Sequence, residues 1–395
     1  MTTVSSWHSP LRLNAKNIIY GLSFFLVFVD FSSYISSYAR AKYVLLAIIG
    51  SFLFLQIRSL LSTKLLTQTW LWLFFVCILM ISSFLNRHNY SRNPFIACAF
   101  AFLGLIEFIL VMEYARQKKQ LGIVLDIFYK ISVCVLIIND VLLFTTSSSE
   151  VYLLGLKFSV AYFHMFVITL WFIRLQSGKI SRSAVNQLTL FILIILSIIT
   201  GIRVDCMTGV VGLALMMTWF LLGTKFPKFV CNPVTAVSTV LISYGFLYVA
   251  PTVMHNSAVR HFVVDILHRD PTMTGRTNIF EVFPQAFEKK PFLGYGYGVS
   301  YDVMSWQGIG FVPDTQNGLA EIMLAGGLAA GALLLALIWN TIKSINPQVG
   351  KMRILAVTSF IYALICIATV EITFSTLFFA CLVLLANISK EKVKA

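Results

Sequence analysis

Long apolar runs recur along almost the whole chain, and most of them are long enough to cross a lipid bilayer. A spanning helix needs about 20 largely apolar residues. The polar arm before the first run carries no small-residue cleavage site after it, which favours a retained anchor over a removed signal peptide. The runs predict about 12 spans, near residues 17–38, 43–57, 68–85, 95–114, 121–144, 157–176, 185–201, 206–223, 234–254, 317–340, 354–369 and 373–388.

The composition agrees with this pattern. Hydrophobic residues make up 58% and charged residues 12% of the chain, whereas water-soluble domains are normally about 45–50% apolar. No linker or repeat divides the sequence, so residues 1–395 are predicted to form a single polytopic membrane domain of the all-α class. The net charge of +14 does not indicate a nucleic-acid partner, because the cations lie in short loops between apolar runs.

The distribution of Lys and Arg predicts the orientation, since these residues concentrate on the cytoplasmic side of membrane proteins. The larger set of Lys and Arg residues lies on the cytoplasmic side if the N-terminus is cytoplasmic. Both termini are then cytoplasmic, and the one long polar loop, residues 255–316, is extracytoplasmic.

This long loop contains a pattern typical of a short amphipathic helix, which we expect to lie on the bilayer surface. Pro284 is tolerated only near the first turn of such a helix, and Pro291 ends it. Its apolar side is formed by Phe280, Phe283 and Phe287.

Two stretches resemble the O-antigen ligase and polysaccharide polymerase family of bacterial membrane glycosyltransferases. The first combines the triplet beginning at Gly275 with the run Lys-Lys-Pro-Phe-Leu-Gly-Tyr-Gly at 289–296. The second, 315–318, precedes Glu321 and the glycine pair 326–327, and is similar to the family's His-Asn pattern. The resemblance covers roughly residues 190–340 in detail.

This resemblance implies a polymerase at the outer face of the bacterial cytoplasmic (inner) membrane. It would join polyprenyl-diphosphate-linked oligosaccharide repeat units into O-antigen, capsule or exopolysaccharide. A related alternative is the ligase that moves a finished polymer onto lipid A core. An alternative of another class is a flippase or transporter of lipid-linked sugars, which twelve spans would suit. Membrane lipids, a chain-length regulator and a flippase are the implied partners.

Two arginines are candidates for binding the donor diphosphate. Arg203 lies in a short outer turn, where the resemblance implies such a role, and Arg276 lies in the long loop. A guanidinium binds phosphate oxygens bidentately and never loses its proton, so it can stabilise a departing diphosphate without a metal. The alternative for both residues is contact with anionic lipid headgroups.

The resemblance implies a histidine base just before the tenth span, but Gln316 occupies that position. An amide can orient a hydroxyl but cannot take its proton, whereas Asp314, two residues earlier, can. Asp314 and Gln316 are therefore the catalytic candidates. Asn317 is a candidate for supporting the acceptor or the loop, and Glu371 is a reserve candidate for the base.

Arg260 and His261 begin a polar cluster ahead of the family motif, which we interpret as a solvated face or as support for the acceptor or the loop. No metal site is predicted, because the chain has no His-x-x-x-His or Cys-x-x-Cys spacing. No nucleotide-binding loop occurs either, so no cofactor is expected.

Charged groups within the spans are expected to be structural. Asp126 and Lys130 stand one helical turn apart and can neutralise each other. Glu107, Asp140 and His164 are interpreted as polar groups satisfied inside the bundle rather than as ligands.

Overall fold

The computed structural model describes residues 14–146, 152–176, 184–257, 261, 276–306, 314–345 and 351–390. All regular elements in these ranges are helices, and one isolated antiparallel bridge joins Tyr152 and Gly155. The first group is α1 (Ala15–Val27), α2 (Tyr38–Leu55), α3 (Ile57–Leu61), α4 (Thr67–Leu85), α5 (Pro94–Gln117), α6 (Leu121–Thr145), α7 (Lys157–Gln176) and α8 (Ala184–Arg203). The second is α9 (Met207–Lys225), α10 (Pro227–Val230), α11 (Pro233–His255), α13 (Arg276–Lys289), α14 (Ser300–Ser305), α15 (Gly318–Lys343), α16 (Lys351–Ile367) and α17 (Thr376–Ser389).

Within the described ranges, nine helices are long and apolar enough to cross a membrane, so the chain is an all-α, multi-pass membrane protein. Three shorter apolar helices, 15–27, 352–367 and 376–389, coincide with the remaining predicted spans. The first of these differs most from its prediction, because α1 ends at Val27 instead of continuing toward residue 38.

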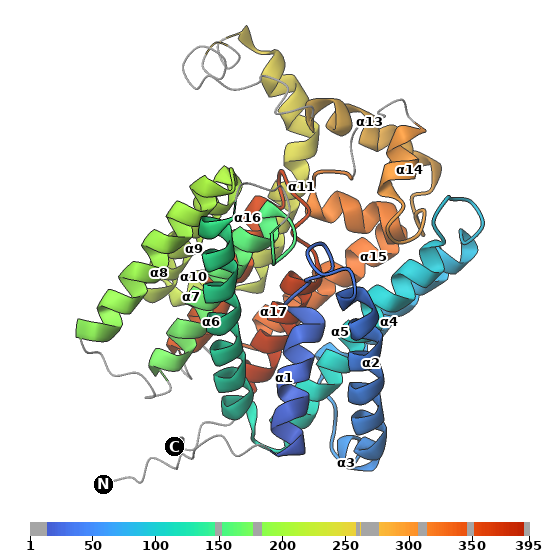
Figure 1. Cartoon of the computed structure of the whole chain (residues 1–395). Coiled ribbons are helices and arrows are strands. Elements are labelled where there is room, and N and C mark those ends of the chain that lie inside the picture. The colour runs from blue at the N-terminus through green and yellow to red at the C-terminus, as the bar shows by residue number, and fades with distance from the viewer. Residues whose placement is uncertain are drawn as a thin grey trace.

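The short helices α16 and α17 lie at the centre of the bundle, although they are not the longest apolar elements. Helix α16 packs against α7, α9, α11 and α17, and α17 also packs against α5 and α15. Their side chains are almost all buried. The other helices surround them (Figure 1), and α2 and α8 are peripheral, with few of their residues buried.

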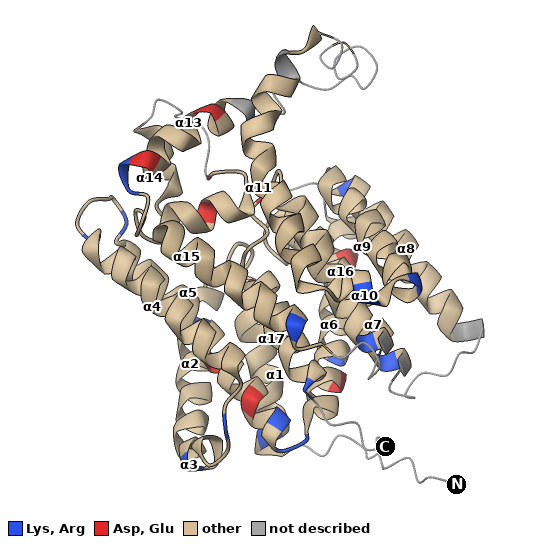
Figure 2. Ribbon diagram, turned by 180° about the vertical axis from the view of Figure 1, so that it is seen from behind, with Lys and Arg blue, Asp and Glu red and all other residues tan. Residues whose placement is uncertain are grey.

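The two ends of the bundle differ in what they carry. Helices α13 and α14 lie together at one end, and α3 and the start of α6 lie at the other (Figure 1). Figure 2 shows most of the Lys and Arg residues toward the α3 end, around α3, α7 and α10.

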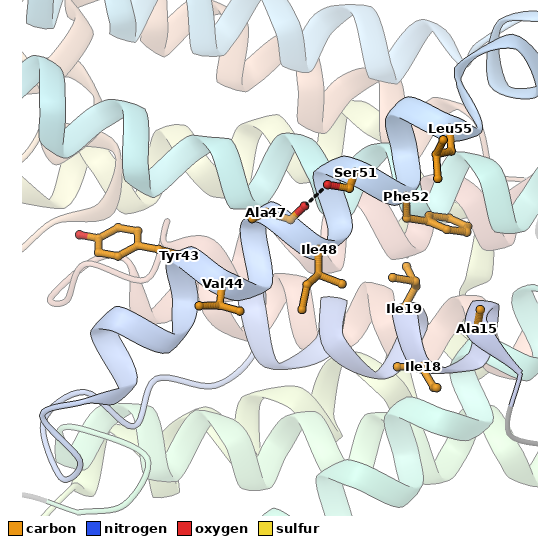
Figure 3. A pocket seen from close by; sticks show the side chains of 10 residues that line it. All are labelled: Ala15, Ile18, Ile19, Tyr43, Val44, Ala47, Ile48, Ser51, Phe52 and Leu55. Atoms are coloured by element: carbon orange, nitrogen blue, oxygen red, sulfur yellow. Dashed lines mark hydrogen bonds between the residues drawn. The ribbon is translucent and has the colours of Figure 1, made fainter.

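An apolar groove opens between α1 and the peripheral helix α2 (Figure 3). Ile19, Ile48 and Phe52 are among its lining residues. The hydroxyl of Ser51 donates to the Ala47 carbonyl at 2.7 Å, so this polar group is satisfied within its own helix. The groove therefore suits the acyl chains of surrounding lipids.

Helix α15 is broken at Gly327, whose φ of 66° and ψ of −164° are not helical. A break in a membrane helix leaves backbone groups that need other partners. Residues 291–296, here called the plug segment, return from α13 and supply them. These hydrogen bonds join Tyr295 N to Leu324 O (2.8 Å), Gly296 N to Ala325 O (2.9 Å), Leu328 N to Pro291 O (2.7 Å) and Ala329 N to Phe292 O (3.3 Å).

The break in α15 and the plug segment are also fastened to the end of α4. The Ser82 hydroxyl donates to the Ala325 carbonyl of α15 at 2.7 Å, and Asn86 Nδ2 donates to the Gly294 carbonyl of the plug segment at 3.4 Å. The Gly-Tyr-Gly run of the long loop is thus a structural part of the α15 break.

Helix α13 has the predicted apolar face, but that face packs on protein rather than on the bilayer. Phe280 and Phe283 are buried in a cluster with Leu247 of α11 and Leu324 of α15. Pro284 lies in the middle of α13 instead of in its first turn. The free energy gained by burying the aromatic face offsets the loss of the backbone hydrogen bond that proline removes.

The ion pair predicted within α6 is present. Asp126 lies 3.1 Å from Lys130 Nζ and also 3.1 Å from a guanidinium nitrogen of Arg174. A satisfied polar group is confirmed for His164, whose Nε2 lies 3.2 Å from Asp140 Oδ1. The prediction holds less well for Glu107 and Asp140, because one buried oxygen of each, Glu107 Oε2 and Asp140 Oδ2, has no hydrogen-bond partner in the described part of the chain.

Candidate active site

Arg276 begins α13 and lies where three segments distant in sequence meet. Its side chain is 21% exposed. Nε donates a hydrogen bond to Gln316 Oε1 at 3.1 Å, and Nη2 forms an ion pair with Glu371 Oε1. A guanidinium holds its N–H groups in one rigid plane, so two fixed partners also fix its orientation.

Gln316 bridges this arginine and a carboxylate. Asp314 Oδ1 accepts hydrogen bonds from the Gln316 backbone N–H at 2.9 Å and from Nε2 at 2.5 Å. A guanidinium only donates and a carboxylate only accepts, so the amide oxygen must face Arg276. The backbone of Gln316 has a φ of 51°, a left-handed conformation that the Asp314 turn stabilises.

Glu371 is in the turn between α16 and α17 and is only 6% exposed. Burial raises the pKa of its carboxyl from 4.5 to about 7, although Arg276 acts in the opposite direction. Burial also raises the pKa of Asp314, against the hydrogen bonds from Gln316 that lower it. The cluster therefore holds one cation and two carboxyl groups with increased proton affinity.

Asn317 stabilises the site without contacting Arg276. Its Oδ1 accepts from the Ala320 N–H at 3.1 Å, which makes it the N-cap of α15. Its Nδ2 donates to the carbonyls of Ser243 at 3.1 Å and Thr369 at 3.4 Å. One side chain thus joins α11, α15 and the turn that carries Glu371.

The outer turn after α8 lies beside the cluster, but the two candidate arginines are not in contact in the described structure. Arg203 is exposed at the end of α8. Three residues later, Cys206 is buried and interacts electrostatically with Glu371, and burial raises the pKa of its thiol to about 11. Lys157 and Asp205 pair across this turn at 3.8 Å.

Of the remaining candidates, His261 is exposed. Arg260 lies outside the described residues, as do Thr274 and Gly275 of the family motif. Tyr162 of α7 is a neighbour that the sequence did not predict. It is 8% exposed, its hydroxyl has no hydrogen-bond partner within the described ranges, and it interacts electrostatically with Glu371 and Arg276. An aromatic residue in an apolar run is indistinguishable from an ordinary core residue.

The cluster combines an anion-binding group with proton acceptors. Arg276 can form charge-assisted hydrogen bonds to phosphate oxygens, and carboxyl groups with raised pKa values can exchange a proton near neutral pH. Both functions lie at the end of the bundle that carries α13 (Figure 1).

Comparison of the chain with protein-family models, curated proteins and solved structures finds no match. A functional assignment therefore depends on the chemistry of the site itself.

Proposed function

We propose that this protein is an integral-membrane glycosyltransferase that polymerises oligosaccharide repeat units carried on a polyprenyl diphosphate. It would act at the outer face of a bacterial cytoplasmic membrane, without a metal, and release the lipid diphosphate as the leaving group. The products would be O-antigen, capsule or exopolysaccharide chains.

The observation that carries the proposal is the fixed, half-buried guanidinium of Arg276. A phosphate ligand at this position would meet a donor that is already oriented, in surroundings with a lower dielectric than water. Arg203, exposed on the neighbouring turn, would supply a second cation for the same diphosphate.

The proposed orientation has twelve spans, with the three shorter apolar helices included, both termini in the cytoplasm and α13 outside. Support comes from the concentration of Lys and Arg at the α3 end of the bundle (Figure 2). A lipid-linked substrate would then enter from the outer leaflet.

A transporter is supported less well. Broken helices line the substrate sites of many transporters, where free backbone groups bind the cargo. In α15 the groups at the break are hydrogen-bonded to the plug segment, so they are not available to a ligand. Polymerase and ligase differ in the acceptor, and the presence of Gln316 instead of histidine favours the polymerase.

The test uses purified protein in liposomes with a polyprenyl-diphosphate-linked oligosaccharide. We expect a ladder of longer lipid-linked products. Arg276→Ala should slow their formation roughly ten- to hundredfold, because a hydrogen bond to a charged group contributes about 1.5–3 kcal/mol. Arg276→Lys should recover only part of the rate, since lysine keeps the charge and loses the planar fork.

Arg40→Ala is the matched control, because Arg40 is an exposed arginine at the start of α2, at the end of the bundle that carries α13. It should retain the wild-type rate. Movement of the lipid-linked sugar across the bilayer without new glycosidic bonds would instead identify a flippase, and transfer only to a lipid A core acceptor would identify a ligase.

A further inference from the structure

The two oxygens of the Glu371 carboxylate have different surroundings. Oε1 is paired with Arg276. Oε2 accepts no hydrogen bond from the described residues. This oxygen is also not fully buried, because it is absent from the set of buried polar atoms without a partner. The carboxylate is therefore held by one oxygen and open at the other, next to the residue that would bind the donor diphosphate.

We infer that Glu371 is the general base of the transfer reaction, an assignment that rests on the proposed function. Its Oε2 takes the proton of the acceptor sugar hydroxyl as that oxygen bonds to the anomeric carbon of the donor. The bond from this carbon to the phosphate oxygen breaks, and its electron pair leaves with the diphosphate bound to Arg276. The proton then passes from Glu371 to water.

The ion pair gives this arrangement its geometric basis. Two oxygens bound to one guanidinium are each about 2.7–2.9 Å from a nitrogen, so a phosphate oxygen on Arg276 and the Glu371 carboxylate are neighbours. The base therefore lies close to the donor diphosphate. The same guanidinium favours the ionised form of Glu371, against the effect of burial, while it neutralises the leaving group.

The other groups of the cluster fit the role of base less well. Asp314 also uses only one oxygen, Oδ1, for its two hydrogen bonds, but these join it to Gln316 and not to Arg276, the residue that would bind the diphosphate. Gln316 itself has no useful basicity, and burial raises the pKa of the Cys206 thiol to about 11, which keeps it protonated.

The proton affinity of Glu371 agrees with the role. Burial raises its pKa to about 7, Asp314 acts in the same direction, and Arg276 and Lys157 oppose them. A base is most effective when its pKa lies near the working pH, because it is then both partly ionised and a strong proton acceptor.

The test measures the initial rate of polymerisation in liposomes between pH 5.5 and 9 for the wild type, Glu371→Gln and Glu371→Asp. We expect the wild-type rate to rise with pH through a step near pH 7. Glu371→Gln keeps a hydrogen-bonding oxygen for Arg276 but removes the base, so its kcat should fall at least about 100-fold and lose the step. Glu371→Asp should keep the step at a reduced rate.

Glu288→Gln on the exposed face of α13 is the control for loss of a carboxylate, and it should behave as the wild type. If Glu371 only positions Arg276, Glu371→Gln will raise the KM for the lipid-linked donor and keep the pH step, which overturns the inference. The inference also fails if Glu371→Asp, folded as judged by its unfolding temperature, shows no step. Absence of product from the wild type would instead contradict the proposed function itself.

Discussion

Replacing Gly327 by alanine tests how the break in α15 is built. A Cβ atom at this position would lie 2.1 Å from the carbonyl carbon and oxygen of Phe292 and 2.5 Å from the Leu293 nitrogen. These are backbone atoms of the plug segment, so no side-chain rotation can relieve the contact. Gly327 also has a φ of +66°, a conformation at this ψ that only glycine adopts easily.

The size of the effect follows from what must move. The backbone conformation alone costs an alanine about 1–3 kcal/mol. Displacing the plug segment also breaks four backbone hydrogen bonds, each contributing about 0.5–1.5 kcal/mol. The total of roughly 3–9 kcal/mol is comparable to the whole stability of many domains, about 5–15 kcal/mol.

We therefore expect Gly327→Ala to lower the unfolding temperature in detergent by at least about 5 °C, and to expose the Lys289–Lys290 bond before the plug segment to trypsin. Gly245→Ala in α11 is the matched control, because a Cβ atom there meets nothing within 4 Å. It should unfold at the wild-type temperature or slightly above it. Wild-type stability of Gly327→Ala would refute the account of the break.

Three further predictions concern topology, the core and pH. A cysteine replacing Glu288 on α13 should react with a membrane-impermeant maleimide in cells with a permeabilised outer membrane. A cysteine replacing Lys343 at the far end of α15 should react only after the cells are lysed. The reverse labelling pattern would invert the proposed orientation. His164→Ala should destabilise the fold by about 2–4 kcal/mol because it leaves the buried Asp140 with only the Asn139 amide as a partner, and adding Asp140→Asn should restore part of the unfolding temperature. Because burial raises the pKa of Glu371 from 4.5 to about 7, its contribution to stability is complete below pH 4.5 and is lost as the pH rises through 7. Glu371→Gln should therefore reduce the fall in unfolding temperature between pH 5 and pH 8, and an unchanged fall would contradict the raised pKa.

The helices could be predicted from the sequence because their signal is local. Each run of about 20 apolar residues specifies a membrane helix by itself, and the predicted run 317–340 corresponds closely to α15. The break inside α15 could not be predicted. Gly327 adopts its conformation because residues 291–296 return to satisfy the freed backbone groups, and a local pattern contains no information about that pairing.

The site shows the same division. Arg276, Asp314 and Gln316 were predicted, and the structure brings them into one hydrogen-bonded chain. The role of Gln316 could not be predicted, because its amide acts as a bridge between two charged groups rather than as a substitute for a base. Glu371 was a weak candidate, since its partner is 95 residues away in the sequence.

The break and the site are mechanically connected through α15. Gln316 stands directly before the N-cap of this helix, and Arg276 begins α13, whose other end leads into the plug segment at the Gly327 break. Because α13 is a helix of 14 residues, about 20 Å long, its two ends move together. Helix α15 therefore influences both partners of the Arg276–Gln316 hydrogen bond. It positions Gln316 directly at its N-terminus, and it positions Arg276 through the plug segment and α13. It follows that Gly327→Ala should impair the site as well as the fold.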